Sequence, residues 1–405
     1  MPRQPPSHAQ LAEHFLRVDA FLRQHETLWR PRPFITGKMG WEAEHPELAH
    51  WLRSRTLEDA EAAHNQPARL AAPAPFPQLA ETATALSWVP PLPNRASANA
   101  DIPQPTDVPG RKWLQIKAFD SVLTFADQPR HWLDWCAGKG HLGRQLAAQG
   151  ETLTCLEWDP QLVEAGTRLS QRLGLPARHL QQDVTQDSAA AQLAPTITPV
   201  ALHACGDLHV RLIELGIAAR CRQLAIAPCC YNRIRTDRYQ PLSALARESL
   251  LELTREDLGL PLSETVTAGA RERRQRDQSM AWRLGFDLLQ RELRGADSYL
   301  PTPSLPASWL SKSFEDYCRG LAALKALPEP AARNWAALEQ QGWLRLAEVR
   351  NLELLRGLFR RPMELWLLLD RALRLAETGY AVRLGTFCPP TLTPRNLLLI
   401  AELNA

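Results

Sequence analysis

Hydrophobic positions recur at helical spacing near the start of the sequence. Leu11, Phe15, Val18 and Leu22 follow one another at intervals of three or four residues. This is the pattern of an amphipathic helix. We therefore predict that residues 8–64 are mainly helical.

The composition changes after this helical region. Pro and Ala dominate between residues 66 and 109, in stretches such as APAPFPQL, WVPPLPN and IPQP. Such a composition favours an extended, polyproline-like connector over packed elements.

Beyond residue 110, short apolar runs alternate with helical patterns. The segment GRKWLQIKAF predicts a helix that leads into the first strand. Five strands are predicted, interleaved with helices, in the segments HWLDWCAG, TLTCLEWD, ARHLQQDV, PVALHACG and QLAIAPCC. Strand and helix alternation is typical of a mostly parallel sheet with helices on both faces, so we predict an α/β fold.

This alternation breaks between residues 236 and 345. The patterns LSALARESLLELTREDLG, QSMAWRLGFDLLQREL and FEDYCRGLAAL predict helices, which we interpret as a helical insertion. The alternation resumes with the helix LELLRGLFRRPMELWLLLDRALRLAETG and two strands, YAVRLGTFC and RNLLLIAEL. The predicted division is a helical region at 1–65, a connector at 66–109, a core at 110–235, an insertion at 236–345 and the end of the core at 346–405.

Composition narrows the class of protein. The chain has 405 residues, of which 45% are hydrophobic and 22% charged, as in an ordinary soluble protein. The N-terminal stretch lacks the apolar run of a signal peptide, and no segment is apolar enough to span a bilayer. We therefore expect a cytoplasmic protein without a membrane partner. The eight cysteines contain no C-x-x-C pair and are expected to be reduced.

The charge pattern leaves the question of a nucleic-acid partner open. The net charge is +3, and only six of the 47 basic residues are lysine. Arginine suits bidentate phosphate contacts, although a GC-rich genome would give the same bias. The run ARERRQRDQ at 270–278 predicts a solvated helix face with ion pairs, and contact with RNA is the alternative.

The stretch LDWCAGKGHLGR carries the chemistry of the predicted core. It contains G-x-G-x-x-G through Gly138, Gly140 and Gly143, directly after the first predicted strand. Such glycines let a backbone approach a nucleotide closely, and an acidic residue about twenty positions on binds its ribose. Glu157 meets that requirement.

A nicotinamide dinucleotide and S-adenosylmethionine both fit this arrangement. Asp134 stands four residues before Gly138, where it would repel a pyrophosphate but attract the sulfonium and ammonium of S-adenosylmethionine. Asp183, at the end of the third strand, would accept from an adenine amino group or cap a helix. Five strands followed by a helix and a closing hairpin are also the order of class I methyltransferases. We therefore predict methyl transfer.

Four motifs in the same order resemble the methyltransferase-like 25 family and its bacterial relatives. They are LDWCAGKGHLGR, LHACGDL at 202–208, CCYN at 229–232 and TPRNLLLIAEL near the end. The tRNA 2′-O-methyltransferase family Trm-thirteen is similar more distantly. The resemblance implies a class I (Rossmann-like) fold and S-adenosylmethionine binding, and it covers neither the N-terminal helices nor most of the insertion. The predicted cofactor-binding residues are Asp134, Cys136, Ala137, Gly138, Lys139, Gly140, Glu157, Asp183 and Cys205.

The methyl acceptor is expected over the carboxyl ends of the fourth and fifth strands. The predicted catalytic residues there are His203, Asp207, Cys230 and Tyr231. Asp207 would act as a base or cap the next helix, and His203 would be a satisfied inner histidine that orients the loop. In the helix before the first strand, Lys112 or Gln115 is expected near the entrance of the cofactor pocket.

A metal site is not expected. His203, Cys205, Cys229 and Cys230 would offer zinc ligands. Side chains alternate between the two faces of a strand, however, so at most one of the two adjacent cysteines is expected to face the cofactor.

The acceptor remains open among RNA, a protein and a small molecule. The rival hypotheses are a nicotinamide-dependent oxidoreductase, supported only by the glycine pattern, and a non-catalytic module that keeps the cofactor fold to bind partners. Binding of nicotinamide would favour the first rival, and absence of turnover would favour the second.

Overall fold

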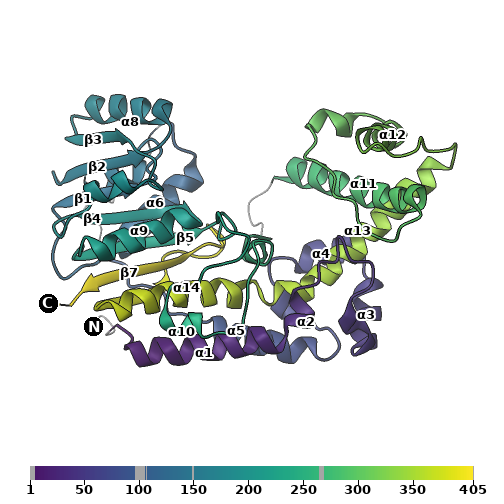
Figure 1. The fold of residues 1–405 in the computed structure, drawn as a ribbon, viewed down its shortest axis with the longest axis horizontal. Coiled ribbons are helices and arrows are strands. Elements are labelled where there is room, and N and C mark those ends of the chain that lie inside the picture. The colour runs from purple at the N-terminus through teal and green to yellow at the C-terminus, as the bar shows by residue number, and fades with distance from the viewer. Residues whose placement is uncertain (1–4, 96–104, 106, 148–149, 264–268, 405) are drawn as a thin grey trace. The chain divides into compact units, whose positions relative to one another are not determined.

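The computed structural model describes residues 5–95, 105, 107–147, 150–263 and 269–404, with only the backbone of Ala270. The chain forms two compact units (Figure 1). Unit 1 comprises Met1–Gln24, Ala85–Val266 and Arg360–Ala405, and unit 2 comprises His25–Thr84 and Thr267–Phe359. Each unit is described by itself.

A seven-stranded sheet forms the centre of unit 1. Its strands are β1 (His131–Trp135), β2 (Thr152–Glu157), β3 (Ala177–Gln181), β4 (Thr198–Cys205), β5 (Gln223–Cys229), β6 (Tyr380–Thr386) and β7 (Leu397–Leu403). The order is β3-β2-β1-β4-β5-β7-β6. The first five strands pair in parallel, and β7 runs antiparallel to both of its neighbours, as the arrows of Figure 1 show for β5. The predicted α/β class and its closing hairpin are confirmed.

Helices cover both faces of this sheet. They are α6 (Gly110–Val122), α7 (His141–Leu146), α8 (Pro160–Arg172), α9 (Asp207–Ala218) and α14 (Arg360–Glu377). The short α10 (Ala244–Arg247) packs on α14, and 3₁₀ turns lie at Asp187–Gln192 and Asp257–Ser263. Trp132 packs in one core with apolar residues of α6 and α7. The indole of Trp135 donates to the carbonyl of Leu208 in α9, at 2.9 Å. Residues three apart on a strand face opposite ways, so these two tryptophans bury opposite faces of the sheet.

The first helix, α1 (His8–Gln24), belongs to unit 1. Its buried stripe includes Phe15, whose ring centroid lies 5.2 Å from that of Trp366 in α14. The Trp366 indole also donates to Asp19, at 2.9 Å. The predicted region 1–65 is therefore divided at Gln24, because the apolar face of α1 covers α14.

The Pro/Ala-rich segment contains a helix, α5 (Phe76–Ser87), where we expected an extended connector. Phe76, Leu79 and Ala83 are buried at helical spacing. Pro77 stands in the first turn, where a missing N–H costs no hydrogen bond. Burial of the apolar stripe thus outweighs the composition. The part of the predicted connector at 96–104 and 106 lies outside the described residues.

Two predicted helices differ from the observed elements. Residues 242–259 were expected to form one helix but give only α10 and a 3₁₀ turn, because tertiary partners bind this backbone, as described below. The helix expected at 352–379 is two helices, α13 (Trp335–Gly357) and α14. Pro362 lacks an N–H and its ring would clash with the carbonyl four residues earlier, so a new helix starts with Pro362 in its first turn.

Unit 2 is helical. Its elements are α2 (Glu26–Trp29), α3 (Pro46–Arg53), α4 (Leu57–Ala63), α11 (Ala270–Arg294), α12 (Phe314–Leu324) and α13, with 3₁₀ turns at Gly40–Ala43, Pro67–Arg69 and Ala307–Ser311. Helices α11 and α13 approach closely, since a Cβ on Gly342 would lie 2.4 Å from the carbonyl oxygen of Ala281.

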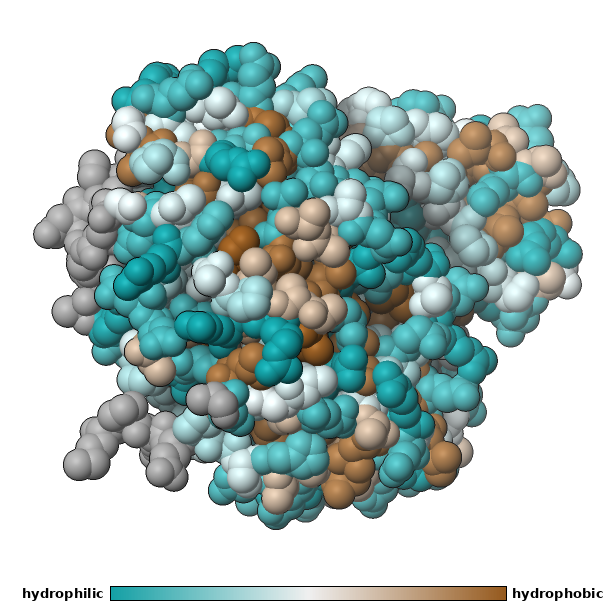
Figure 2. Space-filling view, turned by 60° about the vertical axis from the view of Figure 1, so that its left-hand side comes forward, coloured by the Kyte–Doolittle hydropathy of each residue, from teal (hydrophilic) through white to brown (hydrophobic). Residues whose placement is uncertain are grey.

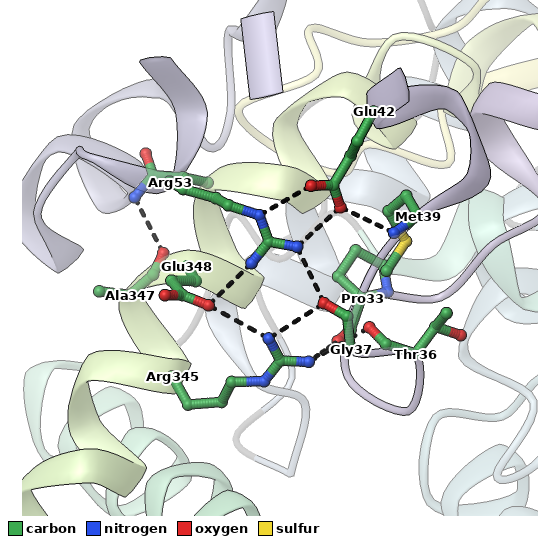
Figure 3. A network of polar contacts seen from close by, with 10 residues as sticks. Pro33, Thr36, Gly37, Met39, Glu42, Arg53, Arg345, Ala347 and Glu348 are labelled. Carbon is green, nitrogen blue, oxygen red and sulfur yellow. Dashed lines mark hydrogen bonds and ion pairs between the residues drawn. The ribbon is translucent and has the colours of Figure 1, made fainter. Parts of the chain in front are cut away.

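Arginines join the helices of unit 2 to its loops. Arg53 donates to Glu42 at 2.7 Å and to Glu348 at 2.9 Å, and Arg345 shares Glu348 at 3.1 Å (Figure 3). In the run ARERRQRDQ, Asp277 pairs with Arg350 of α13 at 2.5 Å. The ion pairs predicted for this run therefore include a link between two helices.

On the face of the molecule that Figure 2 shows, hydrophobic side chains reach the surface in small groups among hydrophilic ones. None of the helices in the described ranges is long and apolar enough to cross a membrane.

Candidate cofactor and acceptor site

The turn after β1 has an unusual backbone. Cys136, Gly138 and Gly140 all have left-handed conformations, with φ of 58°, 57° and 74°. The turn is held against the end of β2, because Ala137 donates its N–H to the carbonyl of Leu156 at 2.9 Å. The N–H of Gly140 in turn donates to the carbonyl of Ala137 at 2.9 Å, so internal hydrogen bonds fix the shape of the turn.

Gly138 and Gly140, the two glycines of the turn, have different surroundings. A Cβ on Gly138 would meet no atom within 4 Å. A Cβ on Gly140 would lie 2.7 Å from the ring of His179 and 3.0 Å from the sulfur of Cys155. Gly140 is therefore needed for packing, whereas Gly138 faces open space that a ligand can enter.

Glu157 lies opposite this turn, at the end of β2. Its carboxylate accepts hydrogen bonds from the backbone N–H groups of Gly138 at 2.8 Å, Trp158 at 3.0 Å and Asp159 at 3.1 Å. A carboxylate has about four acceptor positions, so these three hydrogen bonds leave one of them. The indole of Trp158 is 72% exposed beside it, and it offers a flat apolar surface of the kind on which bases stack.

Asp134 lies in the core at the foot of the turn. It is 2% exposed, and its carboxylate accepts from the N–H of Gly143 at 2.9 Å. Burial raises the pKa of Asp134 to about 6, although the Gly143 hydrogen bond and the charges of Arg144 and Lys112 oppose the shift. The structure thus shows that Asp134 ties β1 to α7.

Lys139 and Asp183 have partners of their own. The Lys139 ammonium lies 3.3 Å from the carboxylate of Asp107. Asp183 is exposed and accepts from the N–H and the hydroxyl of Thr185, at 2.9 and 2.8 Å; these bonds lower the pKa of Asp183. Asp183 shapes the turn after β3 rather than capping a helix.

The carboxyl end of β4 contains a bulge at His203. The pairing with β5 shifts register between Leu202 and Cys205, and His203 has a φ of 63°. The ring nitrogen Nε2 of His203 forms a hydrogen bond with the side-chain oxygen Oε1 of Gln115, at 2.8 Å. Burial lowers the pKa of His203 to about 4, so the ring is neutral at physiological pH, in keeping with the predicted inner histidine.

Gly206 and Asp207 fasten the next turn to the loop after β5. Gly206 has a φ of 49° and a ψ of −123°, a conformation that only glycine adopts readily. A Cβ there would lie 2.0 Å from the carbonyl oxygen of Arg233. The Asp207 carboxylate accepts from the N–H of Arg235 at 2.8 Å, so Asp207 holds a loop, and Gly206 occupies the N-cap position of α9.

Three cysteines meet at the ends of β4 and β5. The sulfurs of Cys205, Cys229 and Cys230 all lie within 4.8 Å of one another, and those of Cys205 and Cys229 are 3.6 Å apart. The prediction that Cys229 and Cys230 point to opposite faces is wrong. Cys230 follows the strand with a φ of 45°, so the alternation of an extended strand does not apply to it.

The neighbouring thiols shift one another. The close sulfurs of Cys205 and Cys229 lower the pKa of Cys230, and those of Cys205 and Cys230 raise the pKa of Cys229. Burial and the charge of Glu157 raise the pKa of Cys136 to about 12.

Tyr231, which directly follows Cys230, is buried between two helices. Its ring is 1% exposed, packs edge-on against His209 at 6.0 Å and lies beneath the guanidinium of Arg371 at 5.3 Å. Among the described residues its hydroxyl has no hydrogen-bond partner. Tyr231 is thus brought into the core between helices rather than to the cofactor turn.

An arginine group beside the site was missed by the sequence analysis. We define the arginine loop as the exposed Arg233, Arg235, Arg238 and Arg255. Arg255 donates to the carbonyl of Arg235 at 3.1 Å, and an isolated bridge joins Arg238 to Thr254. The signal was the segment NRIRTDR directly after CCY, which is less dense in charge than the run at 270–278.

A cavity of about 490 Å³ lies at the opposite edge of the sheet, lined by residues that include Arg130, Thr198 and Gln223. These residues stand at the amino ends of strands. Ligands of open α/β sheets bind at the carboxyl ends, so this cavity is not the cofactor site.

Residues 111–237 match the family model of a methyltransferase domain. This part of the chain is a methyltransferase domain. The match covers the glycine turn, Glu157, the bulge of β4 and the three cysteines. The strand order agrees with the closing hairpin predicted for a class I methyltransferase, because β7 lies antiparallel between β5 and β6. A dinucleotide-binding sheet would continue with parallel units instead. The cofactor of the domain is S-adenosylmethionine, and the nicotinamide alternative is not favoured.

Solved structures give partial likenesses to this methyltransferase domain. A TehB-like SAM-dependent methyltransferase from Corynebacterium glutamicum is 18% identical over 28% of this chain and 60% of its own, with a TM-score of 0.22. An rRNA methylase from Streptococcus thermophilus is 14% identical over 29% and 70%, with a TM-score of 0.22. The 23S rRNA methyltransferase ErmE is 15% identical over 59% and 97%, with a TM-score of 0.24. The domain assignment rests on the family model and the strand order.

Proposed function

We propose that this chain transfers a methyl group from S-adenosylmethionine to an acceptor at the carboxyl ends of β4 and β5. The observation that carries the proposal is the turn held against Glu157 within the matched domain, with Gly138 open to a ligand. Bound S-adenosylmethionine supplies a methyl group on a positively charged sulfur.

The residues of the turn suit this cofactor. Glu157 would accept from the ribose through its remaining acceptor position, and Gly138 would let the backbone approach the ligand. Asp134 would add negative charge near the methionine cation. Cys136, Lys139, Cys205 and Asp183 remain predicted cofactor contacts.

Methyl displacement requires alignment and exclusion of water more than a strong base. His203 and Asp207 act in this proposal as positioning residues. The His203 ring is held by Gln115, whose amide also bonds the carbonyl of Leu392 at 3.2 Å. The Asp207 carboxylate fixes the loop after β5 by accepting the backbone N–H of Arg235. A direct proton transfer by either residue, or by Cys230, stays a prediction.

RNA is the acceptor class that we propose. The arginine loop supports it, because guanidinium groups bind phosphates in a bidentate manner. Asp207, Asp237 and Glu252 neutralise part of this charge. The distant resemblance to the tRNA 2′-O-methyltransferases agrees with an RNA acceptor, whereas the resemblance to the methyltransferase-like 25 family implies no particular substrate.

We expect an Arg235→Ala/Arg238→Ala protein to bind RNA more weakly and with less dependence on salt. Each lost phosphate contact lowers the slope of log K against log salt by about 0.7 for single strands, so the double change should lower it by about 1.4. Binding of fluorescent cellular RNA at several salt concentrations measures this slope. Arg168→Ala, which removes an exposed arginine of α8, is the matched control.

The acceptor itself is identified by incubating the protein with labelled S-adenosylmethionine and separated RNA, protein and metabolite fractions from a deletion strain. Label in RNA that the double variant reduces and the control does not supports the proposal. Label confined to protein or metabolites would reject RNA as the acceptor.

We expect cofactor affinity to fall below about pH 6, because protonated Asp134 cannot attract a cation. Each pH unit below the pKa costs up to about tenfold in affinity. Folding itself favours protonated Asp134, whose pKa is raised; its contribution to stability is complete below pH 3.8 and is lost as pH rises through about 6. Loss of binding at low pH would therefore not reflect unfolding caused by this group.

Isothermal titration with S-adenosylmethionine from pH 5 to 8 tests this expectation. Asp134→Asn should bind more weakly at pH 8 and lose the pH dependence. The proposed role of Asp134 would be wrong if the native protein bound equally well across this range, or if the variant kept the same profile.

A further inference from the structure

The three sulfurs at the ends of β4 and β5 form a cluster of potential metal ligands. Cys205 and Cys229 are paired residues on adjacent strands, and Cys230 follows directly. All three sulfurs lie within 4.8 Å of one another. None of the three side chains is fully exposed, so the group is partly shielded from water.

The spacing of these sulfurs matches that of a metal site. A tetrahedral zinc ion binds thiolates at about 2.3 Å, which places two sulfurs about 3.8 Å apart. The 3.6 Å between Cys205 and Cys229 is already close to this value. Binding of Cys230 then needs only a small movement of its side chain, because its sulfur lies within 4.8 Å of the other two.

Strained backbone brings the sulfurs together. His203 and Cys230 both have positive φ, of 63° and 45°, although neither is glycine. Such conformations are unfavourable for residues other than glycine and persist where the surrounding structure holds them. The bulge turns the chain before Cys205, and the left-handed Cys230 turns it after Cys229. Both departures from extended backbone bring the three sulfurs toward one another.

We propose that Cys205, Cys229 and Cys230 bind one thiophilic divalent metal ion, with Zn²⁺ as the probe, and leave the fourth position to a ligand from outside the chain. The ring of His203 does not fill that position, because it is bonded to Gln115.

The surrounding polar groups suit such an ion. Three thiolates with Zn²⁺ carry one net negative charge. Arg233 and Arg395 both act electrostatically on Cys230 and can balance this charge. Without metal, the thiols of Cys229 and Cys205 donate to the carbonyl of His203, at 3.1 and 3.7 Å. Metal binding replaces these weak bonds, since thiolates are the ligands.

Metal content and cobalt spectra test the proposal on the full chain, purified under reducing conditions without chelators. We expect about one zinc per chain, and Co²⁺ in its place should give the sulfur-to-cobalt absorption of a thiolate site. Cys205→Ser and Cys230→Ser should each lose the metal and the absorption. Cys221→Ser is the control, because its hydroxyl can keep the hydrogen bond to Ala194.

The native protein provides a second readout that does not depend on the folding of variants. Zn²⁺ should slow alkylation of Cys205, Cys229 and Cys230, located by peptide mass spectrometry, and leave the rate at Cys136 unchanged. Equal alkylation with and without Zn²⁺ would overturn the proposal. So would metal that the two variants retain, or a stable Cys205–Cys229 disulfide in the protein that binds no Zn²⁺. Cofactor titration is independent, so failure of the metal site leaves the proposed methyl transfer standing.

Discussion

Replacing Gly206 with alanine should remove methyl transfer and destabilise unit 1 by roughly 3 to 5 kcal/mol. The left-handed backbone costs a non-glycine residue up to about 3 kcal/mol, and overpacking adds about 1 to 3 kcal/mol. The added Cβ would lie 2.0 Å from the carbonyl oxygen of Arg233, which accepts the N–H of Asp207 at 3.0 Å. The loop that follows Cys230 must therefore move.

Urea unfolding and transfer of labelled methyl groups measure the two effects. Gly174→Ala is the matched control, because Gly174 has a φ of 63° but a Cβ there meets no atom within 4 Å. The control should lose about 1 to 2 kcal/mol from backbone strain alone. Equal stability losses in the two variants would contradict the role of the Arg233 contact.

We expect Asp370→Ala to destabilise unit 1 by about 3 to 5 kcal/mol, as when one partner of a buried charged network is removed. Asp370 is fully buried in α14 and accepts from the hydroxyl of Tyr239 at 2.5 Å and from the N–H groups of Leu242 at 3.0 Å and Ser243 at 2.7 Å. Its removal leaves these donors buried without their acceptor. It also releases the segment that begins α10.

The free energy of unfolding in urea, followed by circular dichroism, measures this loss. Glu377→Ala is the control, because exposed Glu377 accepts a hydrogen bond from the N–H of Ala244 at 2.8 Å. Its removal should cost no more than about 1 kcal/mol. A loss for Asp370→Ala as small as that of the control would show that the segment is held by packing instead.

The sequence alone determined the α/β fold and the nucleotide turn. Strands and helices of the core follow local apolar periodicity, and the glycines and Glu157 stand at fixed offsets from the first strand. These features depend on residues that lie no more than about twenty positions apart in the sequence. Local patterns therefore predicted β1 to β7 and the elements that carry the cofactor site.

The tertiary structure decided the positions that depend on distant partners. Asp370 binds the backbone from 242 to 243, where a longer helix was predicted, because satisfying a buried carboxylate outweighs local helix propensity. The apolar stripe of α5 outweighs its prolines. Tyr231 is in the core, although it follows two site cysteines. In each case the deciding contact is far away in the sequence.

The three cysteines show the difference most directly. Alternation along an extended strand predicted that Cys229 and Cys230 diverge, and this holds only while the backbone stays extended. The sequence supplied the thiols and their order. The bulge at His203 and the left-handed Cys230 arise from packing of β4, β5 and the following loop, and they alone bring the sulfurs within reach of one ion.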